Sequence, residues 1–169
     1  MIWWRPQLRV LFVCTANVCR SPLAEALLRQ RLRGLGLQRR VAVASAGTRV
    51  GQPGRPPDPR LRKLALEAGF KLGRIRARQV TPTMLAESDH VLAMEPEHLQ
   101  ELAALFPGGE LPGAARLLGS CDPSMTPAAA AIPDPYCSDW QGFCAVHERI
   151  EAALDGLVDT LLLELEARA

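Results

Sequence analysis

The sequence lacks long apolar runs, a marked excess of charge of one sign and regularly spaced cysteines. No stretch approaches the roughly 18 uninterrupted apolar residues of a membrane-spanning helix, and the most apolar candidate, residues 154–169, contains four acids. A net charge of +2 favours neither nucleic acid nor a membrane as a partner. Residues 1–9 are interrupted too early, by Arg5 and Pro6, to form a signal peptide.

The five cysteines and three histidines show no metal-ligand spacing, and the cysteines do not form the framework of a secreted disulfide-rich domain. We therefore expect reduced thiols, a cytoplasmic protein, and no metal or other cofactor. Three cysteines are predicted to be incidental to function: Cys121, Cys137 and Cys144. Three histidines are predicted to be ordinary surface or strand-end residues rather than ligands: His90, His98 and His147.

Apolar runs rich in β-branched residues alternate with helical patterns along the chain. The runs predict strands at 9–14, 41–47, 89–95 and, more weakly, 114–120. Four helical patterns lie between and after these runs. The first begins with Pro22 in the first helical position, and the second follows residues 56–59. The third covers 99–106, and the last is a long helix over 139–167. This alternation predicts one α/β domain over residues 1–169, with its core at about 8–167 and a doubly wound parallel sheet.

The stretch VLFVCTANVCRSPLAEALL, residues 10–28, predicts a strand, a short loop and a helix. Ligands of parallel sheets bind beyond the carboxyl ends of the strands, and the free N–H groups of such a loop attract an anion. The planar fork of Arg20 suits two oxygens of a phosphate, and a positive loop favours the thiolate form of Cys14. The spacing C-x5-R therefore indicates an anion site with a nucleophile beneath it.

Two neighbours strengthen this interpretation. Ser21 is placed to donate a hydrogen bond to the thiolate, and Asn17 tolerates the left-handed backbone that a tight loop requires. From these residues alone, a buried structural cysteine in an ordinary turn remains an alternative.

The stretch resembles the signature of the low-molecular-weight protein tyrosine phosphatases, C-x4-C-R-S-P followed by an acidic residue in the first helix. Further similar stretches are SAGT at 45–48, PPDPRL at 56–61, ARQV at 77–80, HVLAME at 90–95 and IPDPY at 132–136. The resemblance spans nearly the whole chain in the family's order. It implies a four-stranded parallel sheet with flanking helices and metal-free hydrolysis of phosphomonoesters.

Attack by a thiolate on phosphorus requires an acid that protonates the leaving oxygen. Asp134 lies between Pro133 and Pro135 in a loop, but Asp-Pro is a common turn and also occurs at Asp58 and Asp122. The residues alone therefore leave the choice open. The resemblance implies that Asp134 is the general acid and base.

The expected reaction forms a phosphocysteine on Cys14, stabilised by Arg20, and Asp134 then activates the water that releases phosphate. The residues expected to bind the substrate are Thr15, Ala16, Asn17, Val18, Cys19, Ser21 and Tyr136, the last by stacking on a phosphotyrosine ring. The resemblance also implies a reversible disulfide between Cys14 and Cys19. A purely packing role for Cys19 remains open.

The expected substrate is a phosphotyrosine protein, and VGQP, AME and IPDPY resemble bacterial members that act with tyrosine autokinases of polysaccharide export. The loop after AGT lacks the aromatic residue of several eukaryotic members, and Arg49 and Arg55 could favour an acidic flank instead. We expect a monomer or weak dimer.

Three other protein classes are alternatives to a protein tyrosine phosphatase. An arsenate reductase of this fold needs two cysteines near the middle of the chain, and none occurs between Cys19 and Cys121. A protein-arginine phosphatase tends to carry a small hydroxyl residue at the position of Val18. A non-catalytic phosphotyrosine-binding module would be expected to lack Cys14, Arg20 or Asp134.

Overall fold

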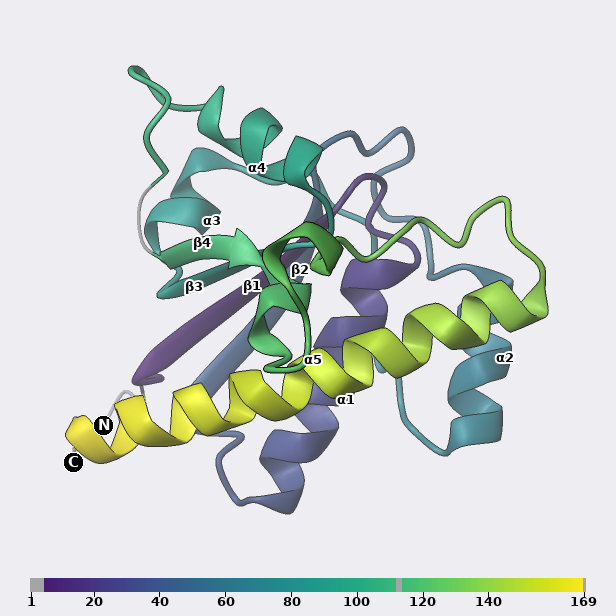
Figure 1. Ribbon diagram of the computed structural model, residues 1–169, viewed down its shortest axis with the longest axis horizontal. Helices are drawn as coiled ribbons and strands as arrows, with labels where there is room; N and C mark the ends of the chain where they lie inside the picture. The colour runs from purple at the N-terminus through teal and green to yellow at the C-terminus, as the bar shows by residue number, and fades with distance from the viewer. Residues whose placement is uncertain (1–4, 112–113, 169) are drawn as a thin grey trace.

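The computed structural model describes residues 5–111 and 114–168. Its sheet contains β1 (Leu8–Cys14), β2 (Val41–Gly47), β3 (His90–Ala93) and β4 (Ala114–Leu117), in the order β2-β1-β3-β4 with all pairs parallel (Figure 1). The central strand β1 therefore has a neighbour on each side. The parallel sheet agrees with the sequence prediction.

The chain leaves β1 toward β2 on one side and later crosses to β3 on the other. This reversal places the carboxyl end of β1 at the topological switch point, where open α/β sheets bind their ligands. The connecting helices are α1 (Arg20–Gly34), α2 (Pro59–Ala68), α3 (Pro82–Ala86), α4 (Pro96–Ala103) and α5 (Trp140–Ala167), with the short 3₁₀ turns η1 (Leu118–Cys121) and η2 (Pro127–Ala129).

Helices cover both faces of the sheet, as Figure 1 shows. Alternate side chains of β1 point to opposite faces. Val10 and Phe12 pack in the larger cluster with α1, α2 and α5, while Leu11 and Val13 pack in the smaller one with α3 and α4. The prediction of a doubly wound sheet is therefore confirmed.

Some boundaries differ from the sequence prediction. Helix α1 begins at Arg20, two residues before Pro22, because proline is tolerated anywhere in the first turn, where its missing N–H has no helical partner. The short helix α3, capped by the Thr81 side chain, was not predicted. The fourth strand ends at Leu117, where the chain turns into η1.

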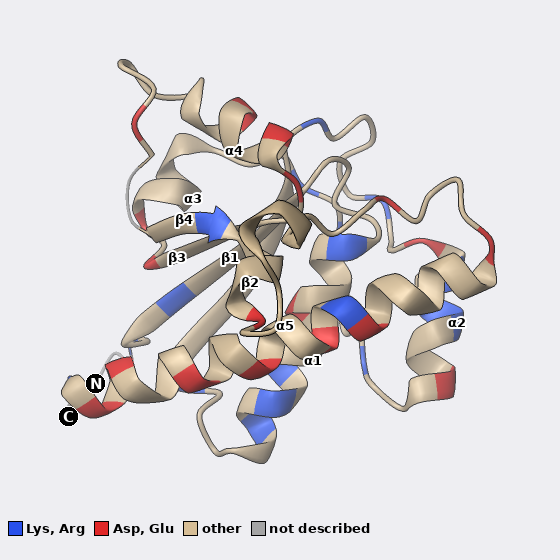
Figure 2. Ribbon diagram, in the orientation of Figure 1, with Lys and Arg blue, Asp and Glu red and all other residues tan. Residues whose placement is uncertain are grey.

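Charged residues join the two longest helices. Figure 2 shows acidic residues spread along α5 and basic residues on α1 beneath it, and Arg31 of α1 forms ion pairs with Glu151 and Asp155 of α5. Of the helices in the described part of the chain, none combines the length and apolar character needed to cross a bilayer.

Gly156 lies in α5 where the helix crosses η1, and a Cβ at this position would overlap the carbonyl oxygen of Cys121. Glycine to alanine normally stabilises a helix by about 1 kcal/mol, but overpacking costs about 1–3 kcal/mol. We expect Gly156→Ala to lower the free energy of unfolding, measured by urea denaturation. Gly34→Ala in α1, where a Cβ has no atom within 4 Å, is the control and should be neutral or stabilising.

Candidate active site

The loop after β1 is held in place by a chain of side-chain hydrogen bonds. The Cys14 Sγ lies 2.9 Å from the Ser21 Oγ. Asn17 adopts the left-handed conformation predicted for it, with φ of 55°. Its amide donates to the hydroxyls of Ser21 and Ser45, each at 2.9 Å, and accepts the Arg78 backbone N–H at 3.0 Å. These bonds fix the loop before any ligand arrives.

Glycine at the end of β2 allows the loop to lie close to the sheet. A Cβ on Gly47 would come within 2.5 Å of the Thr15 carbonyl oxygen. The next two backbone N–H groups, of Thr48 and Arg49, donate to the carbonyls of Cys14 and Thr15, each at 2.9 Å. The SAGT stretch therefore holds the loop between β1 and α1, which we call the anion loop, by backbone hydrogen bonds.

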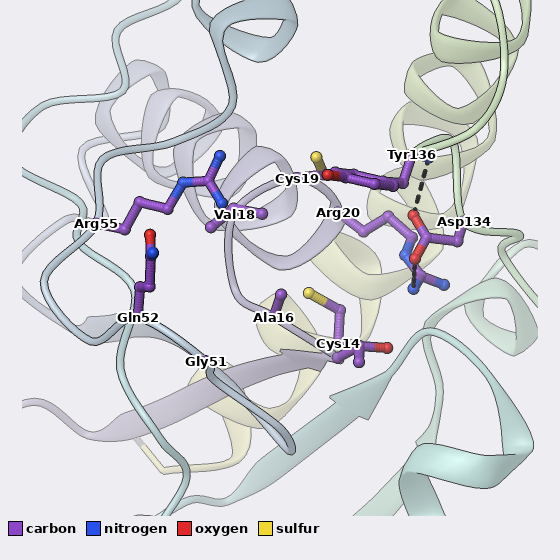
Figure 3. A pocket seen from close by; sticks show the side chains of 11 residues that line it. Cys14, Ala16, Val18, Cys19, Arg20, Gly51, Gln52, Arg55, Asp134 and Tyr136 are labelled. Atoms are coloured by element: carbon purple, nitrogen blue, oxygen red, sulfur yellow. Dashed lines mark hydrogen bonds and ion pairs between the residues drawn. The ribbon is translucent and has the colours of Figure 1, made fainter.

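Among the residues that the structure describes, Arg20 is the largest fully buried side chain, with 2% of its surface exposed. Its Nη1 donates to the Glu95 Oε2 at 2.5 Å and to the Ile132 carbonyl at 2.9 Å. Its Nη2 donates to the Asp134 Oδ2 at 3.0 Å, as Figure 3 shows. These three acceptors hold the guanidinium at the edge of the loop.

Asp134 joins Arg20 to the loop that carries Tyr136. The second carboxylate oxygen of Asp134 accepts the Tyr136 backbone N–H at 3.0 Å. The Tyr136 side chain is 58% exposed and its ring extends along the mouth of the pocket (Figure 3). The structure therefore brings the predicted nucleophile, arginine and acid to one place.

A pocket of about 340 Å³ opens above Cys14. Its lining combines the loop after β1 with two more distant segments, as Figure 3 shows: Cys14, Thr15, Ala16, Val18, Cys19 and Arg20; Gly51, Gln52 and Arg55; and Asp134 and Tyr136. The side chains of Asn17 and Ser21 are buried and form hydrogen bonds that support Cys14. Substrate binding by these two residues stays a prediction.

Cys19 lines the same pocket and is buried. Burial, followed by the negative charge of Asp58, raises the pKa of its thiol, so Cys19 stays protonated at neutral pH. This environment distinguishes it from a nucleophile. The disulfide with Cys14 stays a prediction, and both thiols are free in this structure.

Arg60, which the sequence analysis missed, links α2 to the loop of the predicted acid. Its side chain forms hydrogen bonds with both carboxylate oxygens of Asp58, at 3.1 and 3.2 Å. Its Nη1 donates to the Tyr136 carbonyl at 3.0 Å, and the Tyr136 ring centroid lies 5.7 Å from the guanidinium carbon. Burial alone would raise the pKa of Asp58, but hydrogen bonding from Arg60 outweighs this effect and lowers the pKa.

His98 was predicted to be an ordinary surface or strand-end residue, and this prediction is wrong. Its ring is buried, its Nδ1 accepts the Glu95 N–H at 3.1 Å, and its Nε2 lies 2.9 Å from the Thr15 Oγ1. Because Nδ1 is an acceptor, the proton sits on Nε2, which donates to Thr15. The only signal in the sequence was the E-x-x-H spacing of a helix cap after the third strand.

Burial, and then the positive charge of Arg20, lowers the pKa of His98. The unfolded chain therefore binds a proton more readily than the folded one, and the stability due to neutral His98 is lost as pH falls below about 6.5. We expect the free energy of unfolding to fall between pH 7.5 and 5.5 more steeply in the wild type than in His98→Gln, by at most ~1.4 kcal/mol per pH unit. Urea denaturation at several pH values measures this.

His147→Gln is the matched control, because it removes an imidazole on α5 that packs against Phe70 rather than the anion loop. Equal slopes in wild type and His98→Gln would contradict the assignment of a neutral ring to His98.

The thiol at the end of β1 and the buried arginine at the start of α1 line one pocket, an arrangement that suits a phosphate group. The family described as "Low molecular weight phosphotyrosine protein phosphatase" matches residues 9–167, and the chain belongs to this family. The match covers nearly the whole chain, in agreement with the resemblance found in the sequence, and makes the protein a phosphatase.

Known relatives support the assignment. A "Low molecular weight protein-tyrosine-phosphatase" of Streptomyces coelicolor is 38% identical over 161 residues, covering 95% of this chain and 98% of the relative. "Low molecular weight protein-tyrosine phosphatase A" of Mycobacterium tuberculosis is 39% identical over 152 residues, 90% of each chain. Among solved structures, YfkJ from Bacillus subtilis has a TM-score of 0.84 at 27% identity, covering 95% of this chain and 98% of the other. YwlE arginine phosphatase from Geobacillus stearothermophilus has a TM-score of 0.79 at 28% identity, covering 96% and 97%.

Proposed function

We propose that this phosphatase hydrolyses phosphotyrosine in proteins, with Cys14 as nucleophile, Arg20 as the phosphate-binding residue and Asp134 as general acid and base. One observation carries the assignment of roles: Arg20 lines the pocket above Cys14 and also forms a hydrogen bond with Asp134 at 3.0 Å. A single phosphate can therefore contact all three groups. A thiol, a guanidinium and a carboxyl in this arrangement suit phosphoryl transfer without a metal ion.

The first step transfers the phosphoryl group to the enzyme. The Cys14 thiolate forms an S–P bond while the bond between phosphorus and the tyrosine oxygen breaks, and the Asp134 carboxyl gives its proton to that oxygen. Arg20 turns its fork from Asp134 to the phosphate oxygens, which frees the carboxyl for the leaving group. The Ser21 hydroxyl, 2.9 Å from the sulfur, stabilises the thiolate before attack and again on its release.

The second step releases phosphate. Asp134, now ionised, takes a proton from a water molecule whose oxygen attacks phosphorus, and the S–P bond breaks to regenerate the Cys14 thiolate. Charge on the equatorial oxygens is stabilised in both steps by the loop amides and Arg20. Because these donors are oriented in advance, they supply the largest part of the rate enhancement.

Pocket shape supports phosphotyrosine over phosphoarginine as substrate. Val18 adds an apolar wall where a small hydroxyl residue is expected in arginine phosphatases, and Tyr136 presents an aromatic face at the mouth. Phosphoarginine is the second candidate, because YwlE arginine phosphatase shares the fold at a TM-score of 0.79. A kcat/KM at least tenfold higher on a phosphotyrosine peptide than on the matching phosphoarginine peptide is expected.

The proposed protein substrates carry acidic residues near the phosphotyrosine, since Arg55 lines the pocket on the side opposite Asp134 and Tyr136 (Figure 3). A bacterial tyrosine autokinase is the proposed partner, on the strength of the sequence resemblance alone. A nucleophilic thiol with a second cysteine beside it requires a reducing compartment, which supports a cytoplasmic location. We take the enzyme to be a monomer or weak dimer.

The role of Asp134 as general acid is tested by replacing it and comparing the fall in kcat on two substrates with different leaving groups. Asp134→Asn should reduce kcat for p-nitrophenyl phosphate by about 10²-fold, and for phenyl phosphate by about 10³-fold, because the poorer leaving group depends more on the acid. Reactions run in EDTA measure both. Asp122→Asn, a change at another Asp-Pro dipeptide outside this pocket, is the control and should lose less than about threefold. Equal losses on the two substrates would refute the acid role.

A further inference from the structure

A second pocket, separate from the one above Cys14, is lined by four arginines. It has a volume of about 420 Å³ and lies between α1, the end of β2 and the segment 74–78. We call it the arginine pocket and define its polar lining as Glu25, Arg29, Ser45, Arg74, Arg76 and Arg78. Nothing in the proposed reaction uses this cavity.

Positive charge in the arginine pocket exceeds negative charge. Arg29 forms an ion pair with Glu25, with 2.6 Å between Nη2 and Oε1. Arg74, Arg76 and Arg78 have no carboxylate within 4 Å among the residues that the structure describes. The Arg78 Nε donates to the Ser45 carbonyl at 2.8 Å, and the Arg76 Nη1 donates to the Ile75 carbonyl at 2.9 Å. The remaining guanidinium nitrogens share one cavity, and such forks bind phosphate oxygens in pairs.

The arginine pocket is connected to Cys14 by side-chain hydrogen bonds. Glu25 is only 4% exposed, and its Oε2 accepts the Ser45 hydroxyl at 2.5 Å. Ser45 in turn accepts from Asn17, which donates to Ser21, and the Ser21 hydroxyl lies against the Cys14 sulfur. The chain of bonds thus begins at the wall of the cavity and ends at the nucleophile.

An anion in the cavity would compete with Glu25 for Arg29. Burial raises the pKa of Glu25, and the Ser45 hydrogen bond and the charges of Arg29 and Arg78 partly offset this effect. An anion that engages the two arginines weakens their support of the carboxylate. Ser45 then loses a strong acceptor, and the orientation of Asn17 and Ser21 toward Cys14 is less well held.

We propose that the arginine pocket binds oligophosphate anions and that occupancy lowers kcat at the Cys14 site. Several guanidinium groups around one cavity match several linked phosphates better than a single one. The binding part is independent of the proposed function, whereas the effect on kcat rests on it. The shared chemistry is a chain of phosphates, which either an inorganic oligophosphate or a nucleoside triphosphate supplies.

Calorimetric titration with inorganic tripolyphosphate tests the site. We expect two binding sites in the wild type, the active site and the arginine pocket, and one in the double variant Arg74→Gln/Arg76→Gln, with affinity at the lost site at least tenfold weaker. Arg33→Gln/Arg62→Gln makes the same change of net charge on exposed residues outside this pocket and should retain both sites. A single site in the wild type, or two sites in the Arg74→Gln/Arg76→Gln variant, would overturn the proposal.

Kinetics at saturating p-nitrophenyl phosphate test the link to Cys14, because saturation removes competition at the active site. Tripolyphosphate should lower kcat at least threefold in the wild type and in the control, and leave it unchanged in Arg74→Gln/Arg76→Gln. An unchanged kcat with the second site filled would overturn the link.

The source of the phosphates is tested with adenosine triphosphate. Adenosine triphosphate binding as tightly as tripolyphosphate would indicate that the phosphates alone are recognised, and tighter binding would indicate a nucleotide as the ligand. An inactive wild type would refute the proposed function and leave the titration interpretable.

Discussion

Replacing Cys14 by serine is expected to reduce hydrolysis of p-nitrophenyl phosphate by at least about 10⁴-fold, to the background rate. A serine hydroxyl is not ionised at neutral pH and is a far weaker nucleophile than a thiolate. The change from sulfur to oxygen is small, and the hydrogen bond with Ser21 can be retained. The loss therefore reports chemistry rather than folding.

Two measurements make this result specific. Inorganic phosphate should raise the melting temperature of Cys14→Ser as it does that of the wild type, because the loop amides and Arg20 still bind the anion. Cys144→Ser, which alters a half-buried cysteine on α5, should keep full activity. Residual turnover above about 1% in Cys14→Ser would rule against a phosphocysteine intermediate.

Arg20→Lys is expected to lower kcat/KM by about 10³-fold, the second largest effect. Lysine keeps the charge beside the half-buried Glu95 carboxylate, but it offers one point of contact instead of a planar fork. The two guanidinium nitrogens that now contact Glu95, Ile132 and Asp134 cannot both be replaced. Because the fork binds most strongly to the trigonal phosphoryl group of the transition state, most of the loss should fall on kcat rather than KM.

Arg60→Lys makes the same chemical change beside Tyr136, at the mouth of the pocket above Cys14, and is the matched control. Arg60 contacts the backbone of the acid loop and the Tyr136 ring, so its replacement should cost less than about tenfold, mainly in KM. Equal losses in Arg20→Lys and Arg60→Lys would show that the arginine fork at position 20 has no special part in phosphoryl transfer.

The sequence alone determined the architecture and the position of the anion loop. Four apolar runs separated by helical patterns predict the parallel sheet, because a strand buried on both faces must be apolar throughout. The loop was predictable because its chemistry is local: Cys14, Asn17, Arg20 and Ser21 lie within eight residues, and their contacts form within one turn. The family matches residues 9–167, which include this loop.

The partners of that loop were decided only by the tertiary structure. Glu95 and Asp134 lie 75 and 114 residues from Arg20 in sequence and contact it only because β3 pairs beside β1 and the late loop returns over the sheet. His98, Arg60 and the arginine pocket likewise have ordinary sequence surroundings. Propensity and periodicity report on neighbours along the chain, whereas burial, ion pairing and side-chain orientation depend on segments that meet only in the fold.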